Sequence, residues 1–361
     1  MKFKLSNSFF IGGMIYLALL MSGCSAEQIK SLQSVPSAFG ESNRINVVAD
    51  QDLWDGEVGD TFRFYYASPF LLLPQPEPIF DLRHFTPIKL SSEPLRKELR
   101  TYIFLADLND EDSPTTRLLK SDIGEENLRR AKEDPKFNTT IGRDKWAKGQ
   151  LLIYSFAYGQ ELLIHNIKKN FPALMKKIKA ADRKQMESAV YVTGSDYKIE
   201  ELIKTKFNAE MRIPKDYFVA VEDSNSLWLR LEGKKYSSNM IIHKLKYTDQ
   251  SQLSKEGLKE LRDSLGKLYI TTEIDGAYMR TNDKDLPIFT KNINLNGNFA
   301  LEARGIWDIV NDYMGGPFLS YIVQKKDTDQ LLFIDGFIYA PGQEKRDYMQ
   351  HLEMVISSLK F

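Results

Sequence analysis

The chain has 361 residues, and its 49 lysine and arginine residues balance its 49 aspartate and glutamate residues, so its formal net charge at pH 7 is zero. A neutral chain has no overall positive field to attract nucleic acid, and no motif of a nucleic-acid-binding fold is present, so we expect no nucleic-acid partner. Aromatic residues make up 12% of the chain, which we assign mainly to the packing of half-buried strands.

The first 23 residues have the pattern of an export signal. Two lysines precede an apolar stretch at residues 9–20, FFIGGMIYLALL, which is too short to span a membrane as a helix. The sequence MSGC that follows resembles the lipobox of bacterial lipoproteins, in which the cysteine is acylated and the chain is cut before it. Cys24 is the only cysteine of the chain. We therefore predict a lipoprotein signal peptide over residues 1–23 and lipidation of Cys24. The simpler alternative is an ordinary cleaved signal followed by a chance cysteine.

Lipidation of Cys24 would make the membrane a partner of this protein. One acyl chain holds a protein on a bilayer only marginally, whereas two or three chains on one residue give a stable attachment. In the sorting rule of bacterial lipoproteins, an aspartate after the cysteine favours the inner membrane, and here Ser25 takes that place. We therefore expect a lipid-anchored protein of the cell envelope, at the outer membrane and facing the periplasm. A thioether-linked sulfur also excludes cysteine catalysis and disulfides.

Residues 24–43 are small, polar and weakly periodic, which predicts a flexible tether between the lipid and the fold. We assign residues 44–192 to an N-terminal α+β subdomain, in which apolar stretches at residues 44–50, 100–108 and 149–159 predict strands.

A long helix is predicted after these strands, from about residue 160, because apolar residues recur at helical spacing on one side. That side carries Leu163, Ile167, Phe171, Leu174 and Ile178. The opposite side is the most basic helix face of the chain, and it is either simply solvated or in contact with anionic lipid headgroups. Its lysines are Lys168, Lys169, Lys176 and Lys177.

A boundary is predicted near residues 192–197, and residues 193–361 are assigned to a C-terminal α+β subdomain in which strands predominate. Amphipathic helices are predicted after Ser254 and again near the end of the chain. Groups of strands followed by a covering helix thus occur in both halves. We therefore predict an α+β fold with mostly antiparallel sheets and amphipathic helices packed on one face. Two related subdomains are one form that this architecture can take.

Motifs of known chemistry are absent from the sequence. There is no glycine-rich nucleotide-binding loop, no G-x-S-x-G and no H-E-x-x-H. The four histidines are widely separated, and the acidic loop at residues 107–113 lacks the glycine and glutamate that an EF-hand requires. We therefore predict no catalytic residues, no metal and no cofactor.

The most distinctive string is RGIWDIVNDYMGGPFLSY, from Arg304 to Tyr321. Its two glycines before a proline predict a tight turn with positive φ and a close approach of the backbone. If a ligand site exists, we expect it beside this turn, with an aromatic platform and an arginine that binds an anion. The candidate residues are Arg304, Trp307, Asp308, Tyr313, Gly315 and Gly316. The alternative is that the glycines only turn the chain and that Trp307 fills the core.

Several strings distributed along the chain together resemble the bacterial lipoprotein family of domain of unknown function 4837, found in Bacteroidetes-type envelopes. The resemblance implies an exported lipoprotein over almost the whole mature chain, and it supplies no catalytic residue. The strings are DQDLWDGEVGDTFR, LPQPEPIFDLRHF, DKWAKGQLLI, MRIPKDYFVAVED, RGIWDIVNDYMGGPFLSY and GFIYAPGQEKRDYMQHLE.

The leading hypothesis for function is a binding or structural module of the envelope that takes an unknown envelope protein or a glycan ligand on its sheet face. The alternative is a glycan-acting hydrolase, for which the candidate carboxylates are Asp81, Glu302 and Asp308. A glycosidase needs two free carboxylates about 5–10 Å apart in one cleft. Carboxylates that are scattered, or neutralised by arginines, would exclude this alternative.

Overall fold

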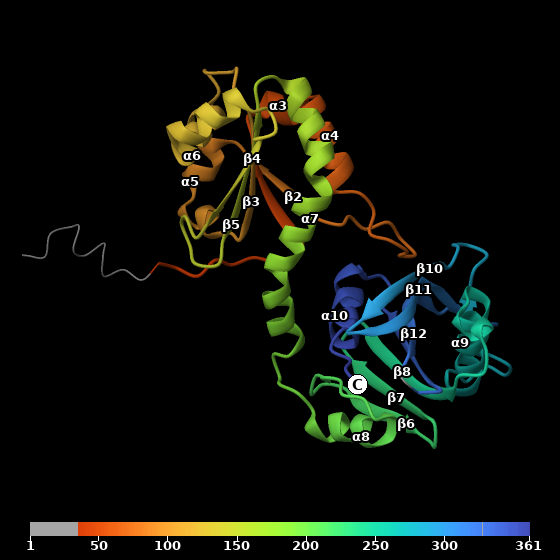
Figure 1. Cartoon of the computed structure of the whole chain (residues 1–361). Coiled ribbons are helices and arrows are strands. Elements are labelled where there is room, and N and C mark those ends of the chain that lie inside the picture. Colours follow the sequence, from red (N-terminus) through yellow and green to blue (C-terminus); the bar gives the residue numbers. More distant parts are fainter. Residues whose placement is uncertain (1–34, 327) are drawn as a thin grey trace, which may run out of the picture.

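The computed structural model describes residues 35–326 and 328–361, which form two β-sheets and the helices packed on them (Figure 1). The predicted signal peptide at residues 1–23, the predicted lipidation of Cys24 and the first part of the predicted tether lie outside the described residues. No helix in the described part of the chain is long and apolar enough to cross a membrane.

The first sheet has the strand order β2-β1-β3-β5-β4. Its first four strands are parallel, and β4 pairs antiparallel with β5 at one edge. The central strands β3 and β5 are almost entirely buried, as expected for parallel strands that are covered on both faces. The strands are β1 Arg44–Val48, β2 Asp81–Phe85, β3 Thr101–Asp107, β4 Thr139–Arg143 and β5 Leu151–Ala157.

Helices cover both faces of this sheet. Alternate residues of β3 belong to two different hydrophobic clusters, with Ile103 and Leu105 in one and Tyr102 and Phe104 in the other. The first cluster is covered by α3 Gln51–Asp55, α4 Glu57–Tyr66 and α7 Gln160–Val190; the second by α5 Pro87–Ser92, a 3₁₀ helix Pro94–Glu98 and α6 Pro114–Glu133.

The second sheet is antiparallel throughout, with the order β10-β11-β12-β13-β8-β7-β6 and with β9 paired to β11. Its strands are β6 Phe218–Glu222, β7 Ser226–Glu232, β8 Ser237–Lys246, β9 Met279–Asn282, β10 Phe289–Leu295, β11 Asn298–Ile309, β12 Gly315–Gln324 and β13 Gln330–Tyr339.

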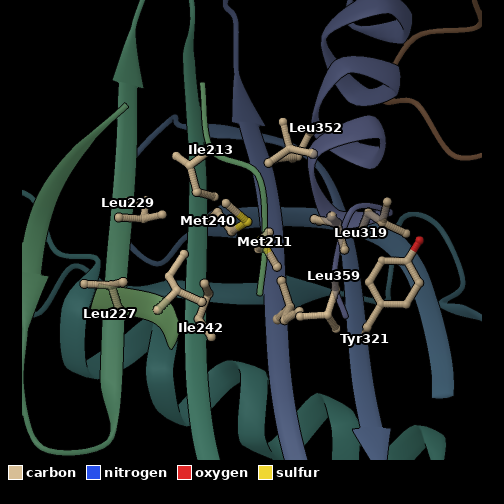
Figure 2. Packing of buried hydrophobic residues seen from close by; sticks show 14 of the residues in the cluster. Met211, Ile213, Leu227, Leu229, Met240, Ile242, Leu319, Tyr321, Leu352 and Leu359 are labelled. Carbon is tan, nitrogen blue, oxygen red and sulfur yellow. The ribbon is translucent and has the colours of Figure 1, made fainter. Parts of the chain in front are cut away.

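This sheet is also covered on both faces. On one face, Leu319 and Tyr321 of β12 pack with Leu352 beneath α10 Arg346–Ile356 (Figure 2), and α8 Tyr197–Phe207 adds to the same cluster. On the other face, Phe318 and Ile322 pack beneath α9 Lys255–Tyr269, which follows a short 3₁₀ helix, Gln250–Leu253.

The predicted α+β class and the predominance of antiparallel pairing are confirmed, but three details of the prediction are corrected. Helices pack on both faces of each sheet instead of one, because the strands of both are apolar on both sides. The two sheets differ in strand direction, so their topology does not show two related subdomains. Residues 35–43, predicted as the end of a flexible tether, are held on the fold by backbone bridges from Ser37 to Lys148 and from Phe39 to Leu99.

Helix α7 connects the two parts of the structure. It runs without interruption over 31 residues and continues through Pro172. Its N-terminal half packs on α4 and the first sheet, and its C-terminal half lies beside α10 of the second (Figure 1). A single helix therefore belongs to both packed units.

Candidate functional site

The C-terminal half of α7, the start of α10 and residues 40–43 meet where the two sheet domains join. The side chain of Gln185 donates to the carbonyl of Gly40 at 2.8 Å, and the backbone N–H of Asn43 donates to Asp182 at 3.0 Å. The amide of Asn43 exchanges hydrogen bonds with that of Gln350, at 2.6 and 3.3 Å. Asn43, Asp182 and Gln350 are all buried, so these bonds are shielded from water.

A second set of contacts fixes the first turn of α10. The buried carboxylate of Glu77 accepts the backbone N–H groups of Lys345 and Arg346, both at 2.7 Å. The guanidinium of Arg346 donates to the carbonyl of Pro78 at 2.8 Å and to Asp81 at 2.9 Å. The first domain thus satisfies N–H groups that the start of a helix leaves without intrahelical partners.

Beside these contacts, between α7 and α10, lies a cavity of about 330 Å³ that is open to solvent on one side. Most of the surface that lines it is apolar, although most of its lining residues also carry a polar or charged group. An apolar surface with polar groups that can orient a ligand is the usual composition of a small-molecule site. The apolar part is formed by Phe70, Ala180, Met186 and Met354, and the polar part by Asn43, Lys179, Asp182, Arg183, Gln350, Glu353 and Ser357. We call this space the interdomain cavity.

Two ionisable side chains that line the interdomain cavity have pKa values shifted by burial. Burial raises the pKa of Asp182 to about 6, although the hydrogen bond from Asn43 and the charge of Arg100 act in the opposite direction. Burial also lowers the pKa of Lys179, while Glu353 nearby opposes that shift. Glu353 itself accepts from Arg304 at 2.7 Å. An acid and an ammonium group thus line the same apolar space.

The lining of the interdomain cavity provides groups that can bind a ligand. The described lining contains no histidine, and its single hydroxyl, on Ser357, donates to the carbonyl of Met354. A nucleophile would need a base within hydrogen-bond reach. The apolar wall with charges at its margin instead suits a small amphiphile that carries a polar or charged group.

The structure brings only one of the six predicted site residues near this cavity. Arg304 lies on β11 and pairs with Glu302 and with Glu353, which lines the cavity. Trp307 points to the opposite face of the sheet, into the core under α9, and packs on Phe337. Trp307 therefore fills the core, as the alternative interpretation of this string predicted.

The other predicted site residues are apart from one another. Asp308 pairs with Arg280 at 2.8 Å, and Tyr313 is fully exposed at the hairpin tip. Gly315 and Gly316 lie in β12, opposite Asp308 and Trp307, and neither has a positive φ. The prediction of a turn at the two glycines is therefore wrong, and the residue with positive φ in the turn is Asn311, with φ of 62°.

The three carboxylates proposed for a glycan hydrolase are all neutralised by arginines. Asp81 pairs with Arg346 at 2.9 Å, Glu302 with Arg304 at 2.7 Å, and Asp308 with Arg280 at 2.8 Å. Asp81 lies on β2, whereas Glu302 and Asp308 lie on β11, and each of the three pairs with a different arginine. This arrangement does not provide the pair of free carboxylates that a glycosidase requires. The hypothesis of a glycan hydrolase that uses these three carboxylates is therefore wrong.

The acidic loop after β3 uses its carboxylates within the fold. Asp107 accepts the backbone N–H groups of Asn109 and Gly159, and Asp110 accepts that of Ser113. Within the described residues, no group of three or more histidine, cysteine or acidic side chains is arranged to hold a metal ion.

Sequence reasoning missed Asp182, although the sequence contains a signal for it. The apolar positions Leu174 and Ile178 on the buried side of α7 are followed, one turn later, by this aspartate, which is 5% exposed. An ionisable residue within an apolar stripe indicates a specific buried partner. The partner itself, Asn43, lies 139 residues away in the sequence and has no local signal.

The fold and the interdomain cavity define a two-domain α+β protein with a candidate ligand site at the domain junction. Residues 196–358, the C-terminal part of the chain, match the family described as Domain of unknown function (DUF4837). Residues 38–191 match a second family, Domain of unknown function (DUF8532). The strings that suggested one family over the whole chain are thus divided between two. No curated protein matches the chain.

Solved structures resemble this chain only weakly. The Ran-binding protein Mog1p of Saccharomyces cerevisiae has a TM-score of 0.28 and 11% identity, over 42% of this chain and 89% of its own. A protein of Bacteroides thetaiotaomicron has a TM-score of 0.24 and 12% identity, over 42% and 44%. The lipid transfer and protein localization domain of human StarD13 has a TM-score of 0.20 and 11% identity, over 45% and 97%. These low scores define neither fold nor function.

Proposed function

We propose that the protein is a lipid-anchored binding protein of the cell envelope. Acyl chains on Cys24 hold it at the outer membrane on the periplasmic side, and its body binds a small amphiphilic ligand in the interdomain cavity. The signal-peptide pattern and the cysteine at its end support the anchor. The cavity supports the binding role.

The observation that carries the binding role is the position of Asp182. This carboxylate is 5% exposed, lines an apolar cavity and accepts a hydrogen bond from Asn43. Burial of a carboxylate in an apolar wall, with a single hydrogen bond to compensate, has a cost. A ligand with a polar group would recover that cost on binding.

The binding role is tested by filling the interdomain cavity. Met354→Trp places a larger side chain in the cavity wall, and Leu268→Trp, on an exposed position of α9, is the matched control. The protein is isolated from envelopes in mild detergent, and native mass spectrometry measures any small molecule that remains bound. We expect a bound species in the wild type and in the control and its loss in Met354→Trp. A wild-type protein without a bound species, in complete envelope extract as well, would overturn the binding role.

The anchor is tested separately. Intact-mass measurement of the purified protein is expected to show the mass of two or three acyl chains on Cys24, and Cys24→Ser is expected to remove them and to release the protein from the membrane fraction. An unmodified Cys24 would overturn the anchor but not the cavity.

A further inference from the structure

The side of α7 that faces away from the domain cores concentrates positive charge on a chain whose net charge is zero. Between residues 168 and 184 the only acidic residue of this helix is the buried Asp182. Because an α-helix turns once in 3.6 residues, its exposed lysines lie outside the stripe of the buried Leu174 and Ile178. Together with Arg143 at the end of β4 they form what we call the basic face: Arg143, Lys168, Lys169, Lys176, Lys177 and Lys184.

The cations of the basic face are exposed and are not neutralised. None of them takes part in an ion pair among the described residues, although nineteen ion pairs are formed elsewhere in the described part of the chain. Lysines of a solvated helix surface commonly pair with acidic residues one turn away. A run of lysines without such partners produces a local positive field that an external anion can neutralise.

A hollow of about 540 Å³ lies within the basic face. Its rim carries Arg143 from β4 and Lys176 and Lys177 from α7, and its floor consists of small side chains, so that an incoming group can approach the cations closely. The floor residues are Ala173, Ala180 and Ala181. Among the lining residues there is no carboxylate. Three cations around an open floor suit a phosphate group, which accepts hydrogen bonds from arginine and lysine together.

The chain leaves the fold beside this face. Lys148, in the loop that follows Arg143, exchanges backbone hydrogen bonds with the first described residues: it accepts from Ala38 and donates to Pro36, both at 2.8 Å. Gly40 contacts Gln185 of α7. Val35 comes eleven positions after Cys24, a length of chain that spans at most about 40 Å when fully extended. An anchored protein therefore has its basic face within reach of the bilayer.

We propose that the basic face docks on the membrane surface and that Arg143, Lys176 and Lys177 bind the phosphate of an anionic lipid headgroup. This rests on the proposed anchoring through Cys24, which places the face near lipid. Lysines near an anionic leaflet each add attraction, whereas a zwitterionic leaflet provides no net charge for them. The anchor sets the distance to the membrane, and the basic face sets the orientation.

The test uses the full acylated chain in vesicles of phosphatidylcholine and in vesicles that also contain phosphatidylglycerol. An amine-reactive reagent labels exposed lysines, and mass spectrometry measures the rate at each position. We expect Lys176 and Lys177 to react about tenfold more slowly on the anionic vesicles, with the protection reversed by salt. Lys234 and Lys235, exposed in the turn between β7 and β8, should react equally on both.

Charge-reversal variants complete the test. Lys176→Glu/Lys177→Glu should abolish the protection of Lys168 and Lys169 on anionic vesicles, and Lys234→Glu/Lys235→Glu, equally exposed, should leave it intact. Equal labelling of the basic face on both vesicles overturns the proposal. Protection by soluble envelope extract without lipid also overturns it, in favour of an acidic protein partner.

The proposal and the anchor can fail separately. If the intact mass shows an unmodified Cys24, the anchor has failed, and the same labelling comparison with added vesicles still decides the basic face: protection on anionic lipid supports docking, and its absence overturns it.

Discussion

Glu77 of the first domain accepts the backbone N–H of Arg346, the first residue of α10 in the second domain, at 2.7 Å. The two residues are 269 positions apart in the sequence. The same carboxylate also accepts the N–H of Lys345, so a negative charge lies at the N-terminus of α10, which is the positive end of the helix dipole. The relative placement of the two domains therefore depends on a helix cap that neither domain contains alone.

Removing this cap is expected to destabilise the protein. Glu77→Ala leaves two buried backbone N–H groups without partners, which we expect to lower the free energy of unfolding by about 1.5–3 kcal/mol. Urea unfolding measures the loss. Glu344→Ala, at an exposed neighbour of the same helix start, should change the free energy by less than about 0.5 kcal/mol. Equal effects of the two substitutions would contradict the cap.

Asp182 is expected to make stability depend on pH. Burial raises its pKa from 3.8 to about 6, so between these values the folded protein binds more protons than the unfolded chain. Stability from this group is therefore present below about pH 4 and is lost as the pH rises through 6. Two pKa units correspond to about 3 kcal/mol. Asp182→Asn cannot ionise and keeps an acceptor for Asn43, so it should be more stable than the wild type by up to about 3 kcal/mol near pH 8.

The same comparison near pH 4 provides the internal control, because there the wild-type carboxyl is protonated and the gain should vanish. Asp275→Asn, at an exposed loop position, should give no gain at either pH. Urea unfolding at both pH values gives the result. A gain of equal size at both would show that the substitution acts through packing and not through ionisation.

Arg262 and Asp335 form an ion pair that is fully buried between α9 and β13, with Nε and Oδ1 3.0 Å apart. Ser320 donates to the same Oδ1, and the guanidinium of Arg262 also donates to the hydroxyl of Thr281. Asp335→Ala leaves a buried guanidinium without its partner, and we expect a loss of about 3–5 kcal/mol.

Replacement of both partners should cost much less. Arg262→Met/Asp335→Leu removes both charges together, so a double-mutant cycle by urea unfolding should give a strong coupling energy. The half-exposed pair of Lys259 and Asp283 is the control, and Asp283→Ala should cost less than about 1 kcal/mol. Additive losses at the buried pair would contradict the prediction.

Gly316 is expected to tolerate no side chain. A Cβ at this position would lie 2.0 Å from the carbonyl oxygen of Ile338, so β12 and β13 must separate to admit it. Gly316→Ala should cost about 2–3 kcal/mol or more. Gly342, with φ of 66° and open space around its Cα, is the control, and Gly342→Ala should cost only about 1–2 kcal/mol of backbone strain. Thermal unfolding of the two variants distinguishes steric conflict from backbone strain.

Local pattern predicted those elements whose residues repeat with a clear period. The amphipathic pattern after Ser254 predicted α9, in which Leu258 and Leu265 are buried. The continuous apolar run of β3 predicted a buried strand but not its direction, because a parallel strand and an antiparallel strand buried on both faces have the same composition.

The candidate site was not predictable in the same way. Its polar contacts join Asn43 to Gln350 across 307 residues and Glu77 to Lys345 across 268, and no periodicity encodes such pairings. The glycine pair at 315 and 316 was recognised as a place of close backbone approach, which the structure shows at Ile338. Its interpretation as a turn was wrong, since close approach between neighbouring strands selects glycine as strongly as a turn does.

The length of α7 has a mechanical consequence. Thirty-one helical residues extend over about 46 Å, and Pro172 removes one hydrogen bond in the first half of that span. A bend of about 10° at the proline would displace the far end of the helix by roughly 5 Å. Because Asp182 and Met186 lie on that far end, a small angular change near the first sheet would be amplified into widening or narrowing of the space beside α10.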